Sequence, residues 1–151
     1  MIASSFISFL AMASTAVLAS PIGNETELVK RQIRDWNCGG KHYTQAQVQD
    51  AFNRGIQFKQ TGQSALFGST PYPHEFRNGL PTRPEVDPSP CAGLEFQEFP
   101  ILPGGVLYSG GWPDADRVVF GSSNPASNSW TPCYLITHTG AASRRLFVKC
   151  T

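Results

Sequence analysis

The stretch that decides the fold is Thr44–Lys59, TQAQVQDAFNRGIQFK. Thr44 followed by Gln47 is a capping box, whose two side chains can bind the first free backbone N–H groups of a helix. The apolar residues that follow recur at helical spacing and form one stripe: Val48, Ala51, Phe52 and Ile56. Gly62 is predicted to end the helix. The sequence therefore predicts one amphipathic helix that ends near Lys59.

Beyond Pro71 the chain has the pattern of short β-strands separated by Gly, Pro and Ser. The predicted strands are Leu94–Leu102, Val106–Tyr108, Arg117–Phe120, Tyr134–Thr139 and Leu146–Cys150, with loops at Gly79–Pro90 and Gly121–Pro132. We expect an α+β fold, with one α-helix packed on one face of a twisted antiparallel β-sheet. The other face of such a sheet is free to hold a site.

Alternation along the predicted strands assigns residues to these two faces. If Phe99 points under the helix, Glu98 points to the opposite face, because successive side chains of a strand alternate. By the same rule Val118 and Phe120 are core residues, and Arg117 projects outward. Glu98 and Arg117 are thus expected on the face away from the helix.

The two ends of the chain differ in composition from the rest. Residues 1–19 hold an apolar run that is too short to span a bilayer and ends in small residues, which is typical of a secretory signal. Residues 20–31 resemble a pro-segment, with a sequon at Asn24 and a dibasic site at Lys30–Arg31; the alternative is a tail that happens to hold two adjacent cations. We expect a secreted, monomeric domain of residues 32–151, with no membrane-spanning segment.

The charge balance gives little evidence for a nucleic-acid binder. The formal net charge is +1 at pH 7, which argues against tight non-specific binding to RNA. An enzyme that acts on RNA needs a positive cleft rather than a positive surface, so such an enzyme is not excluded.

Four cysteines in a secreted chain of this size are expected to form two disulfides, and three pairings are possible. Cys38 and Cys150 lie at the two ends of the mature domain, so a bond between them would close a long loop, worth roughly 4–5 kcal/mol. We expect the pairs Cys38–Cys150 and Cys91–Cys133.

Four residues in short, distinctive contexts carry most of the functional information: His74, Glu98, Arg117 and His138. A carboxylate and two imidazoles can take and give protons, and a guanidinium can face a phosphate. These groups suffice to cleave a phosphodiester without a metal or cofactor. RNA supplies its own nucleophile, the 2′-hydroxyl, so no serine or cysteine is needed. The pattern predicts an endoribonuclease.

The chain resembles the fungal guanyl-specific ribonucleases, whose relatives include the sarcin-type ribotoxins. The resemblance rests on seven motifs in order: Cys38–Tyr43, Tyr72–His74, Glu98–Leu102, Tyr108–Gly111, Ala115–Phe120, Ile136–Ala141 and Phe147–Thr151. It implies cleavage of single-stranded RNA 3′ to guanosine, through a 2′,3′-cyclic phosphate to a 3′-phosphate, without a metal.

The resemblance also implies a role for each catalytic candidate. Glu98 would be the general base, with His74 beside it to assist or orient. His138 would be the general acid that protonates the departing 5′-oxygen. Tyr72 and Arg117 would bind the phosphate oxygens.

The base-recognition segment departs from the family pattern. Phe76 can replace the nearer stacking ring, whereas Gly79 stands where the family has a second ring. Asn78 matches a family asparagine, and Glu85 can be the recognition glutamate only if the intervening residues loop out. The candidate substrate-binding residues are Phe147, Phe76, Asn78, Arg77 and Glu85; a purely core role for Phe147 is the alternative.

Two other features leave alternatives open. Arg144 and Arg145 follow the acid and could contact an additional phosphate or form a solvated basic turn. Cys133 precedes His138 by the ribotoxin spacing, but the chain lacks the long lysine-rich loops of ribotoxins. A general ribonuclease is therefore favoured over a ribotoxin-like or effector ribonuclease, and over a non-catalytic interaction protein that kept the fold.

Overall fold

The computed structural model describes residues 30, 32–80 and 82–151. The secretory signal at residues 1–19 and the pro-segment at residues 20–31, apart from Lys30, lie outside the described residues and stay predictions. Within the described ranges, no helix is long and apolar enough to cross a membrane.

Helix α2 spans Gln45–Thr61 and begins with the predicted capping box. Thr44 Oγ1 accepts a hydrogen bond from the Gln47 backbone N–H at 3.4 Å, and Gln47 Oε1 accepts one from the Thr44 N–H at 2.9 Å. Gly62 ends the helix with a φ of 68°, in the left-handed region that favours glycine. The helix continues slightly beyond its predicted end at Lys59.

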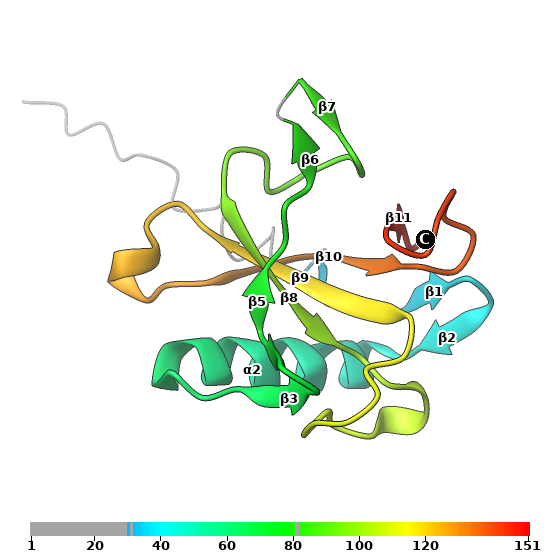
Figure 1. The fold of residues 1–151 in the computed structure, drawn as a ribbon, viewed down its shortest axis with the longest axis horizontal. Helices are drawn as coiled ribbons and strands as arrows, with labels where there is room; N and C mark the ends of the chain where they lie inside the picture. The colour runs from blue at the N-terminus through cyan, green and yellow to red at the C-terminus, as the bar shows by residue number, and fades with distance from the viewer. Residues whose placement is uncertain (1–29, 31, 81) are drawn as a thin grey trace, which may run out of the picture.

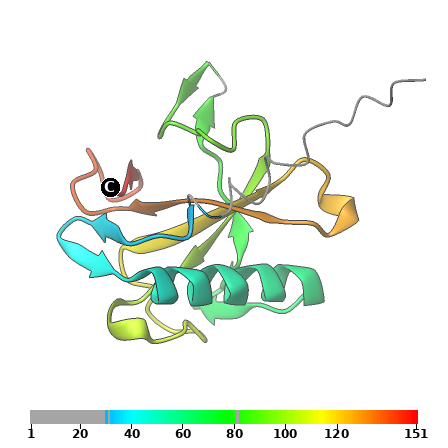
Figure 2. The ribbon, with the colours of Figure 1, turned by 180° about the vertical axis from the view of Figure 1, so that it is seen from behind.

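Five strands form an antiparallel sheet in the order β11-β10-β9-β8-β5 (Figure 1). Their bounds are His74–Glu75 for β5, Glu95–Pro100 for β8, Asp116–Ser122 for β9, Thr131–Thr137 for β10 and Val148–Lys149 for β11. Seen from behind, α2 lies along one side of this sheet (Figure 2). The predicted α+β fold is confirmed.

Three two-stranded hairpins complete the fold: β1–β2 (Trp36–Cys38, Lys41–Tyr43), β3–β4 (Ala65–Phe67, Thr70–Tyr72) and β6–β7 (Gly79–Leu80, Arg83–Pro84). The last one falls in the segment Gly79–Pro90, which was predicted to be a loop. It forms because the Asn78 side chain hydrogen-bonds the Val86 backbone in both directions, at 2.7 and 2.8 Å, and closes the base of the hairpin. This hairpin projects on the side of the sheet away from α2 (Figures 1 and 2).

The predicted strand Val106–Tyr108 was wrong: these residues follow a short 3₁₀ turn, η1 (Pro103–Gly105), and pair with no strand. The Tyr108 ring is buried, and its hydroxyl donates to the Gly111 carbonyl at 2.8 Å. Glycines with positive φ lie on both sides of the segment, so the chain bends back on itself instead of extending. The predicted loop Gly121–Pro132 is shorter than expected, because β9 and β10 continue into it.

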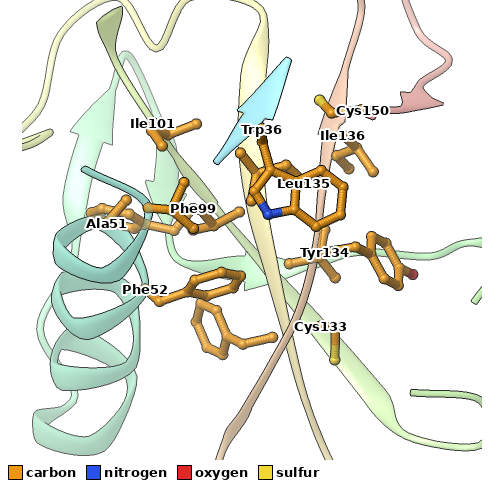
Figure 3. Close-up of a cluster of buried hydrophobic side chains, with 14 of the residues drawn as sticks. Trp36, Ala51, Phe52, Phe99, Ile101, Cys133, Tyr134, Leu135, Ile136 and Cys150 are labelled. Atoms are coloured by element: carbon orange, nitrogen blue, oxygen red, sulfur yellow. The ribbon is translucent and has the colours of Figure 1, made fainter. Parts of the chain in front are cut away.

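The core lies between α2 and the sheet face that it covers. Phe52 is fully buried and points toward Phe99 of β8 (Figure 3). Gly55 permits the close approach of helix and sheet, since a Cβ there would lie 2.9 Å from atoms of both Phe99 and Phe120. Phe99, Val118 and Phe120 have no exposed surface. The predicted core face is therefore confirmed.

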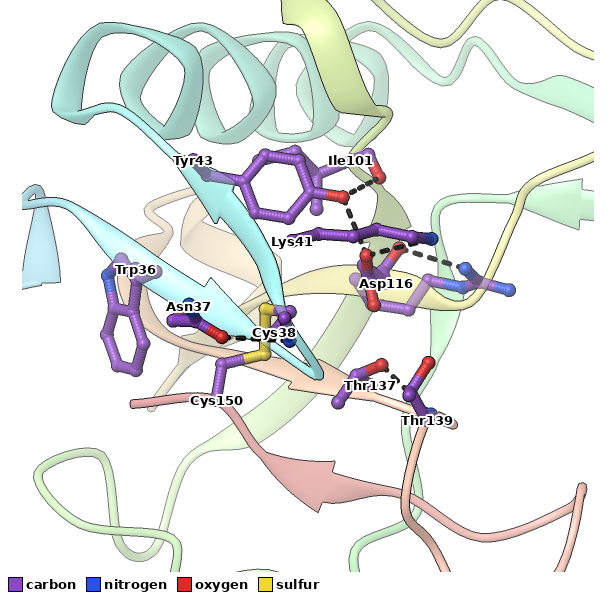
Figure 4. Close-up of a disulfide and its surroundings, with 12 residues drawn as sticks. Trp36, Asn37, Cys38, Lys41, Tyr43, Ile101, Asp116, Thr137, Thr139 and Cys150 are labelled. Carbon is purple, nitrogen blue, oxygen red and sulfur yellow. Dashed lines mark hydrogen bonds and ion pairs between the residues drawn. A yellow bond between two sulfur atoms is a disulfide. The ribbon is translucent and has the colours of Figure 1, made fainter.

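Both predicted disulfides are present, Cys38–Cys150 and Cys91–Cys133. The first joins β1 to the end of the chain (Figure 4). Backbone hydrogen bonds between Asn37 and Thr151, at 2.6 and 3.0 Å, extend the same connection. The N-terminal hairpin and the C-terminus are thereby held beside the central sheet.

Candidate active site

The sheet face opposite α2 carries the residues predicted to be catalytic. His74 of β5 stands directly across from Glu98 of β8, and Pro100 of β8 stands across from Arg117 of β9. Residues that face each other across antiparallel strands point to the same side of the sheet. His74, Glu98 and Arg117 are therefore neighbours on this face, although they are far apart in the sequence.

Glu98 is buried and lies close to the His74 imidazole and the Arg117 guanidinium. Its Oε1 atom lies 3.1 Å from His74 Nε2 and 3.8 Å from Arg117 Nε. The 3.8 Å separation is too long for a hydrogen bond, so the guanidinium acts on the carboxyl group through its charge. Glu98 and Arg117 are only 4% and 3% exposed. The prediction that Arg117 projects outward holds for its direction but not for its exposure, because β9 is a central strand.

The Arg117 guanidinium is fixed by backbone carbonyls. Its Nη1 donates to the carbonyl oxygens of Pro113, Asp114 and Asp116 at 2.9–3.0 Å. Its Nη2 donates to the Tyr72 hydroxyl at 3.3 Å. A cation held in this way keeps one orientation, and no solvent rearrangement is needed when a negative charge arrives.

A cluster of charged side chains anchors the loop that holds Arg117. Lys41 Nζ lies 2.9 Å from Asp114 Oδ2. It also lies 3.5 Å from Asp116 Oδ2, which accepts a hydrogen bond from the Tyr43 hydroxyl at 2.6 Å (Figure 4). Asp116 has no exposed surface. The sequence motifs did not reveal this cluster. The one available signal was alternation, which turns Asp116 toward the helix side of the sheet and so demands a polar partner there.

His138 follows the last residue of β10 and continues its alternation on the face that holds Arg117. Its backbone N–H donates to the Ala115 carbonyl at 3.0 Å. Its Nδ1 lies 2.7 Å from the Leu146 carbonyl; a carbonyl only accepts, so Nδ1 carries a proton and Nε2 is left for other contacts. The ring stacks on Phe147, with centroids 3.8 Å apart.

Tyr72, Arg117 and His138 line one cavity of about 390 Å³. Glu98 lies near Arg117, and the His74 ring lies against the Tyr72 ring, with centroids 4.7 Å apart. The structure thus brings all five predicted catalytic residues into one connected group.

Burial disfavours the charged forms of both members of the Glu98–His74 pair. It raises the pKa of Glu98 to about 7, with Arg117 opposing the rise and Glu85 adding to it. Burial also lowers the pKa of His74, and the Arg117 charge lowers it further. His74 Nδ1 lies 3.0 Å from the Glu75 carbonyl and so carries a proton. His74 Nε2 then faces Glu98 Oε1 at 3.1 Å and can accept a hydrogen bond from the protonated carboxyl group.

The residues predicted to recognise the base lie beside the catalytic residues, with the exception of Arg77. The β6–β7 hairpin loops out the residues between Asn78 and Glu85, and the Glu85 N–H donates to the Asn78 carbonyl at 3.2 Å. Glu85 Oε1 accepts a hydrogen bond from the Phe147 N–H. Phe76 is buried edge-on against Phe147, with centroids 5.7 Å apart. Arg77 is exposed and pairs with Glu75 at 3.1 Å instead.

In the described part of the chain, no group of three or more His, Cys, Asp or Glu side chains is arranged to hold a metal ion. The candidate site contains proton-transfer groups and a fixed guanidinium. Its arrangement can accept a proton at Glu98, supply one at His138 and stabilise negative charge between them.

Comparisons with known proteins show the family of this chain. A family model described as ribonuclease matches residues 31–151. The chain is 40% identical to guanyl-specific ribonuclease Ap1 of Aspergillus pallidus over 77% of this chain and 97% of the relative. It is 36% identical to guanyl-specific ribonuclease T1 of Aspergillus oryzae over 82% and 83% of the two chains, and 38% identical to guanyl-specific ribonuclease F1 of Fusarium fujikuroi over 97% and 93%. The chain therefore belongs to the ribonuclease family.

Proposed function

We propose that this protein is a secreted, metal-independent endoribonuclease that cleaves single-stranded RNA 3′ to guanosine. One observation carries the proposal. A buried carboxyl group lies 3.1 Å from an imidazole and beside a guanidinium fixed by backbone carbonyls, and a second imidazole lines the same cavity as that guanidinium. The relatives, which are guanyl-specific ribonucleases, support the same reaction.

In the first step the 2′-hydroxyl oxygen attacks the phosphorus, and the bond from phosphorus to the 5′-oxygen breaks. In the reactive form Glu98 is ionised and takes the 2′-hydroxyl proton. His138 donates a proton from Nε2 to the departing 5′-oxygen. Arg117 and the Tyr72 hydroxyl stabilise the charge on the phosphate oxygens.

The product of this step is a 2′,3′-cyclic phosphate. Its hydrolysis reverses the roles, because His138 then takes a proton from water and Glu98 returns one to the 2′-oxygen, which leaves a 3′-phosphate. A pKa of about 7 suits Glu98 to both roles near neutral pH. The stacked Phe147 ring and the Leu146 carbonyl keep the His138 ring in one orientation.

The preference for guanine is proposed to come from the segment that follows β5. Guanine presents two neighbouring N–H donors on one edge, and the Glu85 carboxylate is an acceptor beside Phe147 that can receive them. The doubly bonded Asn78–Val86 contact holds the backbone of this segment in place. Phe76 and Phe147 provide the apolar wall; Arg77 is assigned a weaker, solvent-exposed contact with the RNA backbone.

Secretion is proposed from the apolar leader at residues 1–19, with processing after Lys30–Arg31 to a monomeric mature domain. Two disulfides agree with an oxidising compartment. One relative, 39% identical, is named as an extracellular guanyl-specific ribonuclease, from Gibberella baccata.

The proposal is tested by incubating the protein with a defined RNA of mixed sequence in the presence of a metal chelator and by sequencing the products. We expect cuts after guanosine, with cyclic phosphate ends that convert to 3′-phosphates. Cuts without base preference would overturn the guanine assignment, and a reaction that stops in the chelator would overturn the metal-independent mechanism.

Matched variants connect that activity to the site. Glu98→Gln and His138→Ala should each lower kcat by about 10²–10⁴-fold. The controls are Glu95→Gln, an exposed carboxylate on the same strand, and His42→Ala, an exposed imidazole that pairs with Asp35. Both controls should keep full activity. Undiminished cleavage by Glu98→Gln and His138→Ala would sink the mechanism.

A further inference from the structure

Lys149, the last residue of β11, ties the end of the chain to a loop that is distant in the sequence. Its Nζ donates hydrogen bonds to the backbone carbonyls of Asp87 and Ser89, at 3.1 and 2.6 Å. The Asp87 carboxylate is largely exposed and lies 4.0 Å away, so it adds little to the contact. Hydrogen bonds from a charged donor are about twice as strong as those between neutral groups. The ammonium group of Lys149 thus holds the loop at two points.

Both sides of this contact are fixed before they meet. The Lys149 backbone pairs with Ile136 of β10, and its Nζ lies over the buried ring of Tyr134 on the same strand, 4.7 Å from the centroid. On the loop, Asp87 Oδ1 accepts a hydrogen bond from the Ser89 N–H at 3.0 Å. This bond closes the turn between the two carbonyls that Lys149 binds.

The same loop holds the carboxylate to which the proposed function assigns guanine. Glu85 lies two residues before Asp87, and Phe147 lies two residues before Lys149. Glu85 Oε1 accepts a hydrogen bond from the Phe147 N–H. Within the described ranges, no backbone–backbone hydrogen bond joins residues 85–89 to residues 147–149. The hydrogen bonds between these two segments therefore come from the side chains of Glu85 and Lys149.

A cavity of about 420 Å³ lies between the two segments. Glu85 lines it from the side of the loop, and Phe147 and Val148 line it from the side of β11. Lys149 does not line the cavity. Lys149 can therefore influence a base in this cavity through the position of the loop, without touching the base.

We propose that Lys149 is a positioning residue for guanine recognition, which holds the loop at Asp87–Ser89 so that the Glu85 carboxylate faces the base. The proposal rests on the proposed function, because it takes Glu85 as the acceptor of the two guanine N–H donors. Without the ammonium group, the loop is free to move away from β11 and to take Glu85 with it.

The test compares guanylyl-3′,5′-adenosine with inosylyl-3′,5′-adenosine, whose base lacks the amino group and keeps one of the two N–H donors. Lys149→Met removes the ammonium group and keeps most of the side-chain length. It should lower kcat/KM for the guanylyl substrate about tenfold, as expected for the loss of a hydrogen bond to a charged group, and that for the inosylyl substrate about threefold at most. The ratio of the two values does not depend on the folded fraction, so partial unfolding cannot imitate this result.

Two further variants of Lys149 keep the proposal testable if Lys149→Met does not fold. Lys149→Arg retains a charged group with several donors and should restore most of the ratio. Lys149→Gln retains a neutral donor and should give an intermediate ratio. The matched control is Lys59→Met in the last turn of α2, where Nζ also lies over an aromatic ring, that of Trp130, at 5.5 Å. This control should leave the ratio unchanged.

A double variant asks whether Lys149 acts through Glu85. In a Glu85→Ala background, Lys149→Met should cause no further change in the ratio, because the group that Lys149 positions is gone. An equal change in both backgrounds would overturn the positioning role.

The outcomes also separate this inference from the proposed function. A wild-type protein that cleaves neither substrate, or both with the same kcat/KM, overturns the guanine assignment of Glu85 and the role of Lys149 together. A wild type that prefers the guanylyl substrate, with Lys149→Met keeping the same preference, overturns the role of Lys149 alone.

Discussion

The two faces of the central sheet are both buried, but they differ in the groups that they bury beside α2 and at the candidate site. On the face covered by α2, Phe99, Val118 and Phe120 have no exposed surface and pack against Phe52 and one another. On the other face, Glu98 and Arg117 are also almost fully buried, yet both carry ionisable or charged groups. The difference arises from alternation along the same two strands, one residue at a time.

This contrast shows that burial serves two purposes in this protein. Burial of apolar rings stabilises the fold through the hydrophobic effect and close packing. Burial of Glu98 costs free energy when the group ionises, and that same cost raises its pKa into the range useful for proton transfer. The packing of the helix face thus offsets the free-energy cost of ionising the buried Glu98 on the site face.

The largest expected effect comes from breaking the helix face. Phe99→Ala should lower the free energy of unfolding by about 3–5 kcal/mol, because it leaves a cavity beneath α2. The folded fraction should keep its activity, since Phe99 points away from the site. Chemical denaturation combined with activity per folded molecule measures both. A loss below 1 kcal/mol would show that the helix face does not form the core.

The next largest effect is expected when the ionisable group of Glu98 on the site face is replaced by a neutral one. The folded-state pKa of Glu98, about 7, lies above the ordinary value of 4.5. The folded state therefore holds the proton more tightly, and the contribution of Glu98 to stability is lost as the pH rises from 4.5 to 7. Glu98→Gln removes this loss and should be more stable than the wild type above pH 7, by at most about 3 kcal/mol.

The measurement is a pair of unfolding curves for wild type and Glu98→Gln at pH 4 and pH 8. The difference between the two proteins should grow with pH and level off above pH 7. Glu95→Gln, whose carboxylate is exposed, should show no such trend. A Glu98→Gln protein less stable than the wild type at pH 8 would contradict the comparison of the two faces.

A smaller effect is expected in the pH dependence of the rate. Because the base must be ionised, kcat/KM should fall about tenfold for each pH unit below about 7. The measurement is kcat/KM for guanylyl-3′,5′-adenosine from pH 4 to 8. If kcat/KM falls only below about pH 4.5, burial does not raise the pKa of Glu98, and the site face differs from the helix face less than we infer.

The smallest effect concerns the cluster that anchors Arg117. Lys41→Met leaves the buried Asp116 carboxylate with Tyr43 as its remaining partner, and should lower the free energy of unfolding by about 1–2 kcal/mol. Activity should fall several-fold, because the loop that binds the guanidinium loosens. Asp114→Asn, which breaks only the more exposed pair, should cost less than 1 kcal/mol. Equal effects of the two variants would argue against an anchoring role for Asp116.

Much of the fold was predictable because its signals are local. The capping box and the apolar stripe specify α2, and alternation assigned Glu98, Phe99 and Val118 to the correct faces. The strand Val106–Tyr108 was wrong because an apolar run does not reveal that Tyr108 bonds back to Gly111. The hairpin at Gly79–Pro84 was missed because it depends on Asn78 binding Val86 across the loop.

The sequence by itself determined which chemical groups are present and which strand face Glu98, Phe99 and Val118 occupy, because short periodic patterns and motif order encode these features. Only the tertiary structure decided the raised pKa of Glu98, the carbonyl cage around Arg117 and the stacking of His138 on Phe147. The physical reason is distance along the chain. Burial, electrostatic fields and ring contacts depend on groups that approach one another only after folding.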